Sequence, residues 1–121
     1  MTEPGKPPEP FLQNFDTVPP VPCPCGEARR VVHAEASPTI GIHKVIVSGN
    51  AKLHYHDRLT EHYIILQGEG MLRLNNERRP VRPGDVIMIP PGVRHALEGN
   101  FELINVVTPP FDPTDEHVVE D

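Results

Sequence analysis

From residue 28 to residue 107 the sequence is a succession of short β-prone runs, each closed by glycine, proline or asparagine. No window shows the sustained apolar spacing that an amphipathic helix requires. Many short strands separated by turn residues are typical of an all-β sandwich or barrel. A chain of 121 residues suits one such domain. The expected strands cover residues 30–34, 39–48, 52–56, 61–67, 69–74, 78–82, 85–89, 93–97 and 102–107.

The two ends of the chain differ from this central region in composition. Half of the 16 prolines fall within the first 24 residues. Because proline lacks a backbone N–H, residues 1–26 are predicted to form an extended arm that docks on the barrel or on a neighbouring subunit. Residues 112–121 hold five acidic residues and no lysine or arginine, which predicts a loose, solvated acidic tail. The barrel is expected between them, over residues 27–111.

Charge and hydropathy exclude several classes of function. The tail supplies most of the formal net charge of −6, so the barrel itself is close to neutral. A neutral barrel with an acidic tail argues against nucleic-acid binding. No apolar run approaches the roughly 18 to 20 residues of a membrane helix. The N-terminus lacks the basic start and apolar stretch of a secretory signal, so the expected location is cytoplasmic.

The two cysteines, Cys23 and Cys25, lie in the sequence Pro-Cys-Pro-Cys-Gly. Cysteines two residues apart are too close to bridge comfortably, and they supply only two ligands for a metal. We therefore expect unbridged cysteines on the surface or in the arm.

Four polar residues have the spacing of a metal site. His54 and His56 are two residues apart, so on a strand they point to the same face. Glu61 opens the next run, and His95 follows the tight turn at residues 90–92. A lone His-x-His is more often just two strand histidines, but this joint pattern is specific. Imidazole and carboxylate ligands together suit Fe, Mn, Ni, Co or Zn, and the sequence does not choose among them.

These residues resemble the first of two motifs of the cupin superfamily. That motif has the form Gly-x5-His-x-His-x3–4-Glu-x6-Gly. The stretch from His54 through His56 and Glu61 to Gly68 fits it. Its leading glycine is displaced, because Gly49 stands one residue closer than the motif requires.

The second cupin motif has the form Gly-x5-Pro-x-Gly-x2-His-x3-Asn. The stretch from Gly84 through Pro90 and Gly92 to His95 fits it, but Gly99 stands in place of the terminal asparagine. The resemblance implies a single double-stranded β-helix, or jelly-roll, barrel. It also implies that one divalent metal ion is bound by His54, His56, Glu61 and His95.

Three further residues are candidates for more than metal binding. Tyr63 shares the inward face of Glu61, so its phenol either donates to a metal-bound oxygen, acts as a base or simply packs. In short cupins that resemble dimethylsulfoniopropionate lyases a tyrosine near the glutamate ligand is the base. Arg58, near the barrel mouth, either steers an anionic substrate or is a solvated loop residue. The sequence leaves open whether His43 or Lys44 faces the cavity.

The resemblance implies a metal-dependent enzyme acting on a small oxygen-rich organic molecule by chelation to the divalent ion. Dioxygenase, isomerase and lyase chemistry are all compatible with such a site. The alternative is a non-catalytic cupin that binds a metal or small ligand or has a regulatory role. Small cupins commonly pair through edge strands, and the apolar arm suits a dimer interface, so we expect a homodimer.

Overall fold

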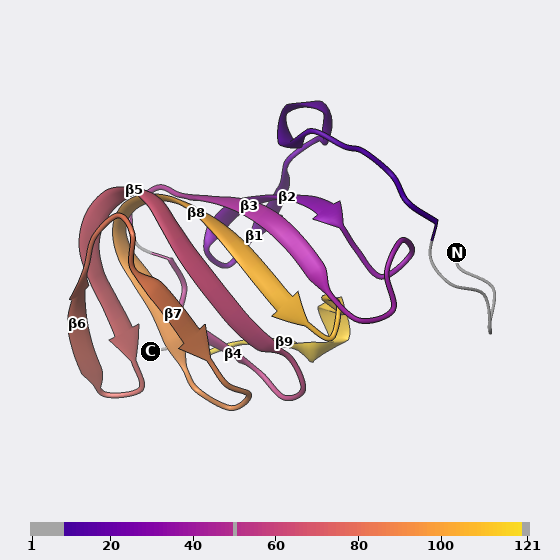
Figure 1. Cartoon of the computed structure of the whole chain (residues 1–121). Coiled ribbons are helices and arrows are strands. Elements are labelled where there is room, and N and C mark those ends of the chain that lie inside the picture. The colour runs from indigo at the N-terminus through magenta and orange to yellow at the C-terminus, as the bar shows by residue number, and fades with distance from the viewer. Residues whose placement is uncertain (1–8, 50, 120–121) are drawn as a thin grey trace.

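Figure 1 shows the computed structural model of the chain, which describes residues 9–49 and 51–119. The expected all-β fold is confirmed, because strands curl into a jelly-roll barrel and the described helices are two single 3-10 turns. No helix in the described ranges is long and apolar enough to cross a membrane. The elements are η1 (Phe15–Thr17), β1 (Val21–Cys23), β2 (Gly26–Val32), β3 (Gly41–Val47), β4 (His54–His56), β5 (Thr60–Leu74), β6 (Glu77–Val81), β7 (Val86–Ile89), β8 (His95–Thr108), η2 (Pro113–Asp115) and β9 (Glu116–Val118).

Two long strands, β5 and β8, form the central pair of the barrel and are antiparallel partners over their whole length. The sequence predicted four separate strands here, because glycine usually ends a strand. That prediction is wrong, since the glycines bend the strands without ending them. Gly68 has φ +104°, and a side chain there would collide with the carbonyl of Asn100 on β8. The bend lets each strand contribute to two parts of the barrel.

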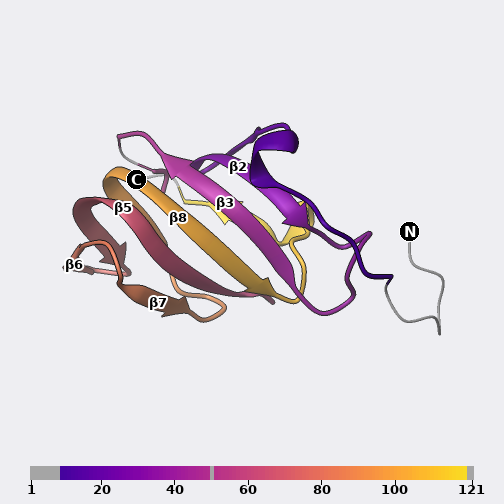
Figure 2. The same ribbon diagram turned by 45° about the horizontal axis from the view of Figure 1, so that its top comes forward.

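The strand order places β8 at the centre of the molecule. β1, β2, β3, β8 and β5 lie side by side in one curved sheet, and β7 extends it beyond β5 (Figure 2). The N-terminal end of β8 also pairs with β4, which in turn pairs with β9. In Figure 2 β9 lies behind the curved sheet. The space between these two layers holds the core.

Side chains alternate across each strand, which separates an inner face from an outer one. Alternate residues of β3 and β8 are buried, beginning at Gly41 and Phe101 respectively. Most of the inward residues are aliphatic and pack with Phe101 and Tyr63 into one core cluster. Several inward positions are polar instead, and these buried residues are candidates for a functional site. They are His43, His54, His56, Glu61, His95 and Asn105.

The end of the N-terminal arm joins the sheet as the edge strand β1, which pairs with β2. Arg29 fastens the preceding turn by donating to the carbonyl of Val18 at 2.9 Å. Cys23 and Cys25 are joined in a disulfide, so the expectation of unbridged cysteines is wrong. The turn between β1 and β2 places the Cα atoms of the two cysteines 5.3 Å apart, within the usual range for a disulfide. Residues 1–8 of the predicted arm lie outside the described residues.

The acidic C-terminal segment is folded onto the barrel, so the expectation of a loose tail is wrong for residues 112–119. Asp112 caps η2 by accepting from the backbone N–H of Thr114, and Pro113 opens the turn. β9 then pairs with β4, with Glu116 opposite His56. The acidic residues dock because they accept hydrogen bonds, which the charge pattern did not reveal. Residues 120 and 121 lie outside the described residues.

Candidate metal centre

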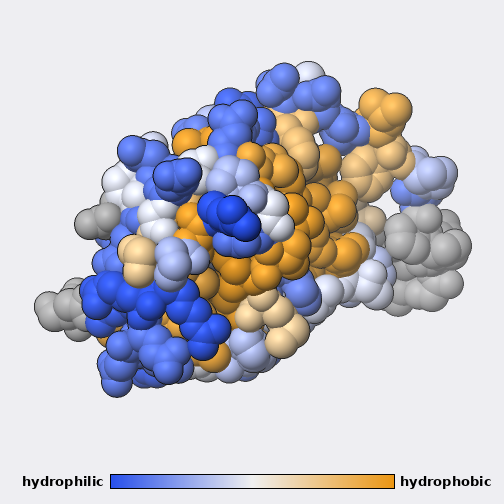
Figure 3. Space-filling view, turned by 60° about the vertical axis from the view of Figure 1, so that its left-hand side comes forward, coloured by the Kyte–Doolittle hydropathy of each residue, from blue (hydrophilic) through white to orange (hydrophobic). Residues whose placement is uncertain are grey.

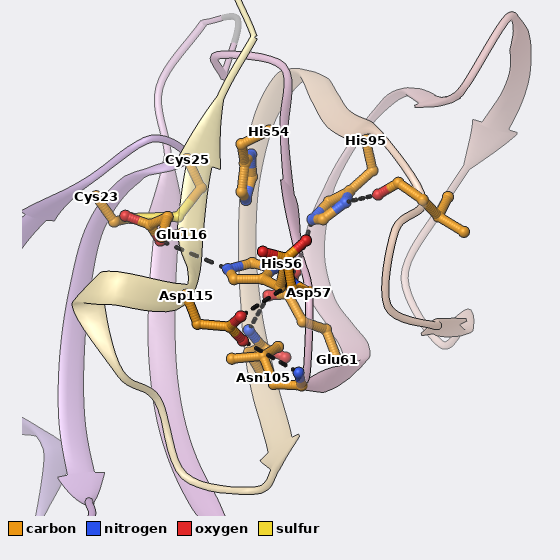
Figure 4. Close-up of polar contacts among 12 residues, drawn as sticks. Cys23, Cys25, His54, His56, Asp57, Glu61, His95, Asn105, Asp115 and Glu116 are labelled. Atoms are coloured by element: carbon orange, nitrogen blue, oxygen red, sulfur yellow. Dashed lines mark hydrogen bonds and ion pairs between the residues drawn. A yellow bond between two sulfur atoms is a disulfide. The ribbon is translucent and has the colours of Figure 1, made fainter.

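The four residues predicted as metal ligands converge inside the barrel (Figure 4). β4 carries His54 and His56, β5 carries Glu61 and β8 carries His95. Each offers a donor atom, and these atoms all lie within 4.8 Å of one another. The four residues are buried, with 1 to 5% of their surface exposed. His54 and His95 are direct cross-strand partners, which explains why residues so distant in sequence meet.

Backbone carbonyls orient two of the imidazoles. Nδ1 of His54 lies 2.9 Å from the carbonyl oxygen of Lys52, and Nδ1 of His95 lies 2.9 Å from that of Val93. In each ring Nδ1 is therefore the protonated nitrogen that donates, and Nε2 keeps its lone pair. Metal-binding histidines are typically held in this way by a second hydrogen bond.

The closest contact in the site is between two groups that both offer electron pairs. Nε2 of His95 lies 2.6 Å from Oε1 of Glu61, and both buried atoms lack a hydrogen-bond partner. Two lone pairs held at this distance repel unless a cation or a proton lies between them. The donor set therefore fits a divalent metal ion.

The protonation states of His54 and Glu61 also favour metal binding, whereas that of His56 opposes it. Burial, and then the neighbouring His95, lower the pKa of His54 to about 4, so its imidazole is neutral. Burial opposes the charge of Glu61, but the close contacts of its carboxylate with the rings of His56 and His95 outweigh burial and keep its pKa well below the usual value. Burial likewise opposes protonation of His56, but the carboxylates of Glu116 and Glu61 outweigh burial and raise its pKa to about 9. This imidazole must therefore release a proton before it coordinates a metal. A neutral imidazole and an ionised carboxylate are the forms that coordinate metals.

Tyr63 and Arg58 lie outside the cavity wall. Tyr63 packs in the core, with its ring centroid 6.1 Å from that of His95. Burial and the nearby Glu61 carboxylate raise the pKa of Tyr63 well above its usual value, so its phenol is a hydrogen-bond donor and not a base. The Arg58 side chain is 61% exposed and lies 3.1 Å from Asp112 and 3.5 Å from Asp115. Their predicted roles in catalysis and substrate binding remain predictions.

The choice between His43 and Lys44 is resolved in favour of His43. His43 is buried and lines the cavity, whereas Lys44 lies on the outer face and pairs with Glu102 at 2.6 Å. Burial, and then the charge of Arg30, lower the pKa of His43 to about 4.

Sequence reasoning missed several residues that line the same cavity. Its volume is about 20 Å³, close to that of one water molecule or one ion. Asn105 lies on its wall and donates from Nδ2 to Oε2 of Glu61 at 2.6 Å. A polar residue at an inward position between Leu103 and Val107 was the available signal. The remaining polar and aromatic lining residues outside the ligand set are Arg30, Phe111 and Glu116.

Asp115 supports the site from beneath, at the connection between β4 and β5. Its buried carboxylate accepts hydrogen bonds from the backbone N–H groups of Asp57 at 3.0 Å, Arg58 at 3.1 Å and Leu59 at 3.2 Å. These residues join His56 to Glu61. Asp115 therefore fixes the turn on which the spacing of two ligands depends, and sequence reasoning missed it because the tail was expected to be loose.

Comparison with known proteins agrees with this architecture. Residues 41–107, more than half of the chain, match the family model described as Cupin domain. An uncharacterised protein of Methanocaldococcus jannaschii is 36% identical over 80 residues, a match that spans 63% of this chain and 64% of that protein.

Solved structures show the same fold. A protein from Planctomyces limnophilus superposes with a TM-score of 0.83 at 34% identity, covering 90% of this chain and 96% of that one. A nucleoside dehydratase from Streptomyces superposes with a TM-score of 0.81 at 22% identity, covering 93% and 92% respectively.

Proposed function

Because the chain belongs to the cupin domain family, we propose that it is a metal-dependent enzyme acting on a small oxygen-rich organic molecule. One observation carries the proposal. His54, His56, Glu61 and His95 are buried with their donor atoms within 4.8 Å of one another. Such a set has little structural use without a cation, since buried polar atoms are normally partnered.

The four ligands would hold one divalent ion of Fe, Mn, Ni, Co or Zn. When bound, the ion supplies a Lewis acid that stabilises negative charge developing on a chelated substrate. The protein contributes the orientation. Asn105 holds one oxygen of Glu61, and the carbonyls of Lys52 and Val93 hold the imidazoles. The core side chains around the ligands exclude water, which strengthens these interactions.

Dioxygenase, isomerase and lyase reactions remain compatible with this site. The likeness to a nucleoside dehydratase supports the lyase type, since dehydration is an elimination. At 22% identity that likeness concerns the fold, so the substrate of that enzyme is not transferred to this chain.

Tyr63 is the proposed proton-transfer group, acting as a donor because it lies two residues beyond Glu61 on the same inward face. Tyr63→Phe removes only the hydroxyl. Loss of turnover at unchanged metal content would support this role. Unchanged turnover would show that Tyr63 only packs in the core.

Elemental analysis of protein purified without added metal tests the metal centre. We expect one divalent ion per chain in the native protein and in His62→Ala. His62 is a suitable control because its Nδ1 lies 2.9 Å from the carbonyl of Val106, away from the ligand set. We expect His95→Ala to lose the ion. A wild-type chain that binds none even after reconstitution would contradict the proposal.

The small volume of the cavity favours a second candidate, a cupin that binds a metal or small ligand without turnover. About 20 Å³ accommodates an ion or a compact group but not a large substrate. Substrate screening with the metal-loaded protein, followed by oxygen uptake and product formation, separates the two candidates. Turnover would exclude the binding role, and tight ligand binding without turnover would exclude the enzyme.

A further inference from the structure

The imidazole ring of His56 lies between two carboxylates (Figure 4). Its Nδ1 is 3.3 Å from Oε1 of Glu61, and its Nε2 is 3.7 Å from Oε2 of Glu116. Glu61 belongs to the proposed ligand set, whereas Glu116 lies outside it. Glu116 opens β9 and is the direct cross-strand partner of His56 on β4. The two nitrogens of this ring therefore face different surroundings, Nδ1 toward the ligand set and Nε2 toward the C-terminal strand.

His54 and His95 are held with the opposite orientation. In both rings Nδ1 donates to the backbone carbonyl of the residue two positions earlier. Nε2 is then the nitrogen left for a metal, and in His95 it lies 2.6 Å from Oε1 of Glu61. The same Glu61 oxygen therefore meets Nε2 of one histidine and Nδ1 of another. His56 differs from the other two histidines in the nitrogen that it presents to the site.

An imidazole that binds a metal coordinates through one nitrogen and donates the N–H of the other. If Nδ1 of His56 coordinates, the N–H that remains is on Nε2 and faces Glu116. A carboxylate accepts a stronger hydrogen bond than a backbone carbonyl does, because it is charged. Such a partner also raises the basicity of the imidazole toward the metal. Glu116 is thus suited to orient His56, as backbone carbonyls orient the other two histidines.

The fold fixes the position of Glu116. Its side chain is 22% exposed, and it follows Asp115, whose buried carboxylate accepts backbone hydrogen bonds from the β4–β5 connection. Arg30, in the same cavity wall, supplies a counter-charge for the Glu116 carboxylate and lies with its guanidinium carbon 4.1 Å from the centroid of the Phe111 ring. Glu116 is therefore part of the cavity wall, and the volume of about 20 Å³ beside it remains for an ion.

We propose that Glu116 is a positioning residue of the metal centre, which accepts the Nε2–H of His56 and makes this histidine coordinate through Nδ1. His54 and His95 coordinate through Nε2. Glu116 acts through His56 and does not itself bind the ion. The inference rests on the proposed function, since it takes a metal to be bound by the four ligands.

The ring nitrogens of the Zn²⁺-loaded wild-type protein test this assignment without any substitution. Zn²⁺ has a filled d shell, so it leaves the spectra of nearby nuclei sharp. Long-range proton–nitrogen correlation spectra of protein with isotope-labelled histidine distinguish a protonated ring nitrogen from a metal-bound one. We expect a protonated Nε2 and a metal-bound Nδ1 in His56, and the reverse in His54 and His95. Coordination of His56 through Nε2 would overturn the inference.

Variants at Glu116 measure its effect on metal affinity. We expect Glu116→Ala to lower the Zn²⁺ affinity by about 10- to 100-fold, the usual effect of losing an orienting partner. Glu116→Gln should lower it less, because the amide oxygen still accepts a hydrogen bond. Competition with a chromophoric chelator measures both changes. In Glu116→Gln the Nε2 resonance of His56 should also shift, while those of His54 and His95 should not. An unchanged affinity in Glu116→Ala would contradict the proposal.

His117→Ala is the matched control, because it removes a contact of β9 without touching His56. The side chain of His117 alternates away from that of Glu116, and its Nε2 lies 2.7 Å from Oδ2 of Asp57. We expect this variant to bind Zn²⁺ as tightly as the wild-type protein. An equal loss in His117→Ala and Glu116→Ala would assign the effect to the packing of β9 and overturn the role of the carboxylate.

The outcomes separate this role from the proposed function. A wild-type chain that binds no Zn²⁺, even after reconstitution, would contradict the metal centre and the inference with it. Zn²⁺ bound with His56 coordinating through Nε2 would retain the metal centre and overturn the role of Glu116 alone.

Discussion

Glu61 is the residue on which the proposed metal centre depends most. It lies within 3.3 Å of His56 and 2.6 Å of His95, and Asn105 holds its other oxygen. It is the anionic member of the ligand set. The three imidazoles are neutral when they coordinate, so this carboxylate supplies the charge that retains a divalent ion.

Glu61→Gln should therefore weaken metal binding while preserving the shape of the site. Loss of an orienting partner typically lowers metal affinity by about 10- to 100-fold. Loss of the ligand charge should lower the metal affinity at least as much. Competition with a chromophoric chelator measures the change. Glu69→Gln, on the same strand but exposed, is the matched control. Equal affinities in the two variants would rule out Glu61 as a ligand.

Single residues also show where sequence-based reasoning reaches its limit. The positions of His54, His56, Glu61 and His95 were predictable because spacing along a strand and at a tight turn decides which way a side chain points. Arg30 and Glu116 were not predictable, because strand pairings between distant parts of the chain bring them to the cavity. Local pattern contains no information on those pairings.

At the scale of elements, the C-terminal turn and strand hold the β4–β5 connection in place. Asp115 on η2 accepts three backbone hydrogen bonds, and β9 pairs with β4.

The lack of information on strand pairing in local sequence also explains the wrongly predicted strand boundaries. A glycine in sequence signals a turn, and only the pairing of β5 with β8 shows that it bends one continuous strand.

Asp115→Asn should destabilise the fold, because the amide keeps one acceptor oxygen and loses the charge. We expect a decrease of about 1–3 kcal/mol in the free energy of unfolding, as for hydrogen bonds to a charged group. Urea denaturation at neutral pH measures it. Asp85→Asn, whose carboxylate accepts from the N–H of Arg82 in an exposed turn, is the control. A smaller loss for Asp115 than for Asp85 would contradict its supporting role.

The contribution of Asp115 should also depend on pH. Burial opposes its charge, but backbone hydrogen bonds from Arg58, Leu59 and Asp57 outweigh burial and lower its pKa. A lowered folded-state pKa gives stability that is present above the unfolded value of about 3.9 and is lost as pH falls through the folded value. The stability difference between wild type and Asp115→Asn should thus be constant near neutrality and shrink below about pH 4. A difference that grows in acid would be inconsistent with this carboxylate.

At the scale of the whole molecule, one outer face of the sheet is unusually apolar (Figure 3). Val86 and Met88 on β7 are 69% and 62% exposed, and Val86 is the cross-strand partner of Ile64 on β5. Ile64 is in turn the partner of Ile104 on β8. Apolar faces of this kind commonly mark protein–protein interfaces. This face is a better candidate for the expected homodimer interface than the arm.

Met88→Glu should convert a homodimer into a monomer, because an isologous interface would bury the new charge twice. Light scattering over a range of protein concentrations measures the mass. Leu12→Glu tests the rival interface, since Leu12 in the arm is 93% exposed. Dissociation by Leu12→Glu alone would assign the interface to the arm. A wild-type monomer at all concentrations would refute self-association.

The central position of β8 has a consequence for how the protein folds. β8 pairs with β3, β4 and β5, so most of the sheet cannot form until a strand late in the chain is in place. Such non-local pairing is typical of proteins that fold slowly. His54, His56 and Glu61 are close in sequence and can bind an ion before β8 pairs, whereas His95 joins the site only when β8 is in place. An ion held by the unfolded chain stabilises the native state less than its native affinity implies. Metal should therefore accelerate refolding only if binding by these three residues promotes the pairing of β4 with β8.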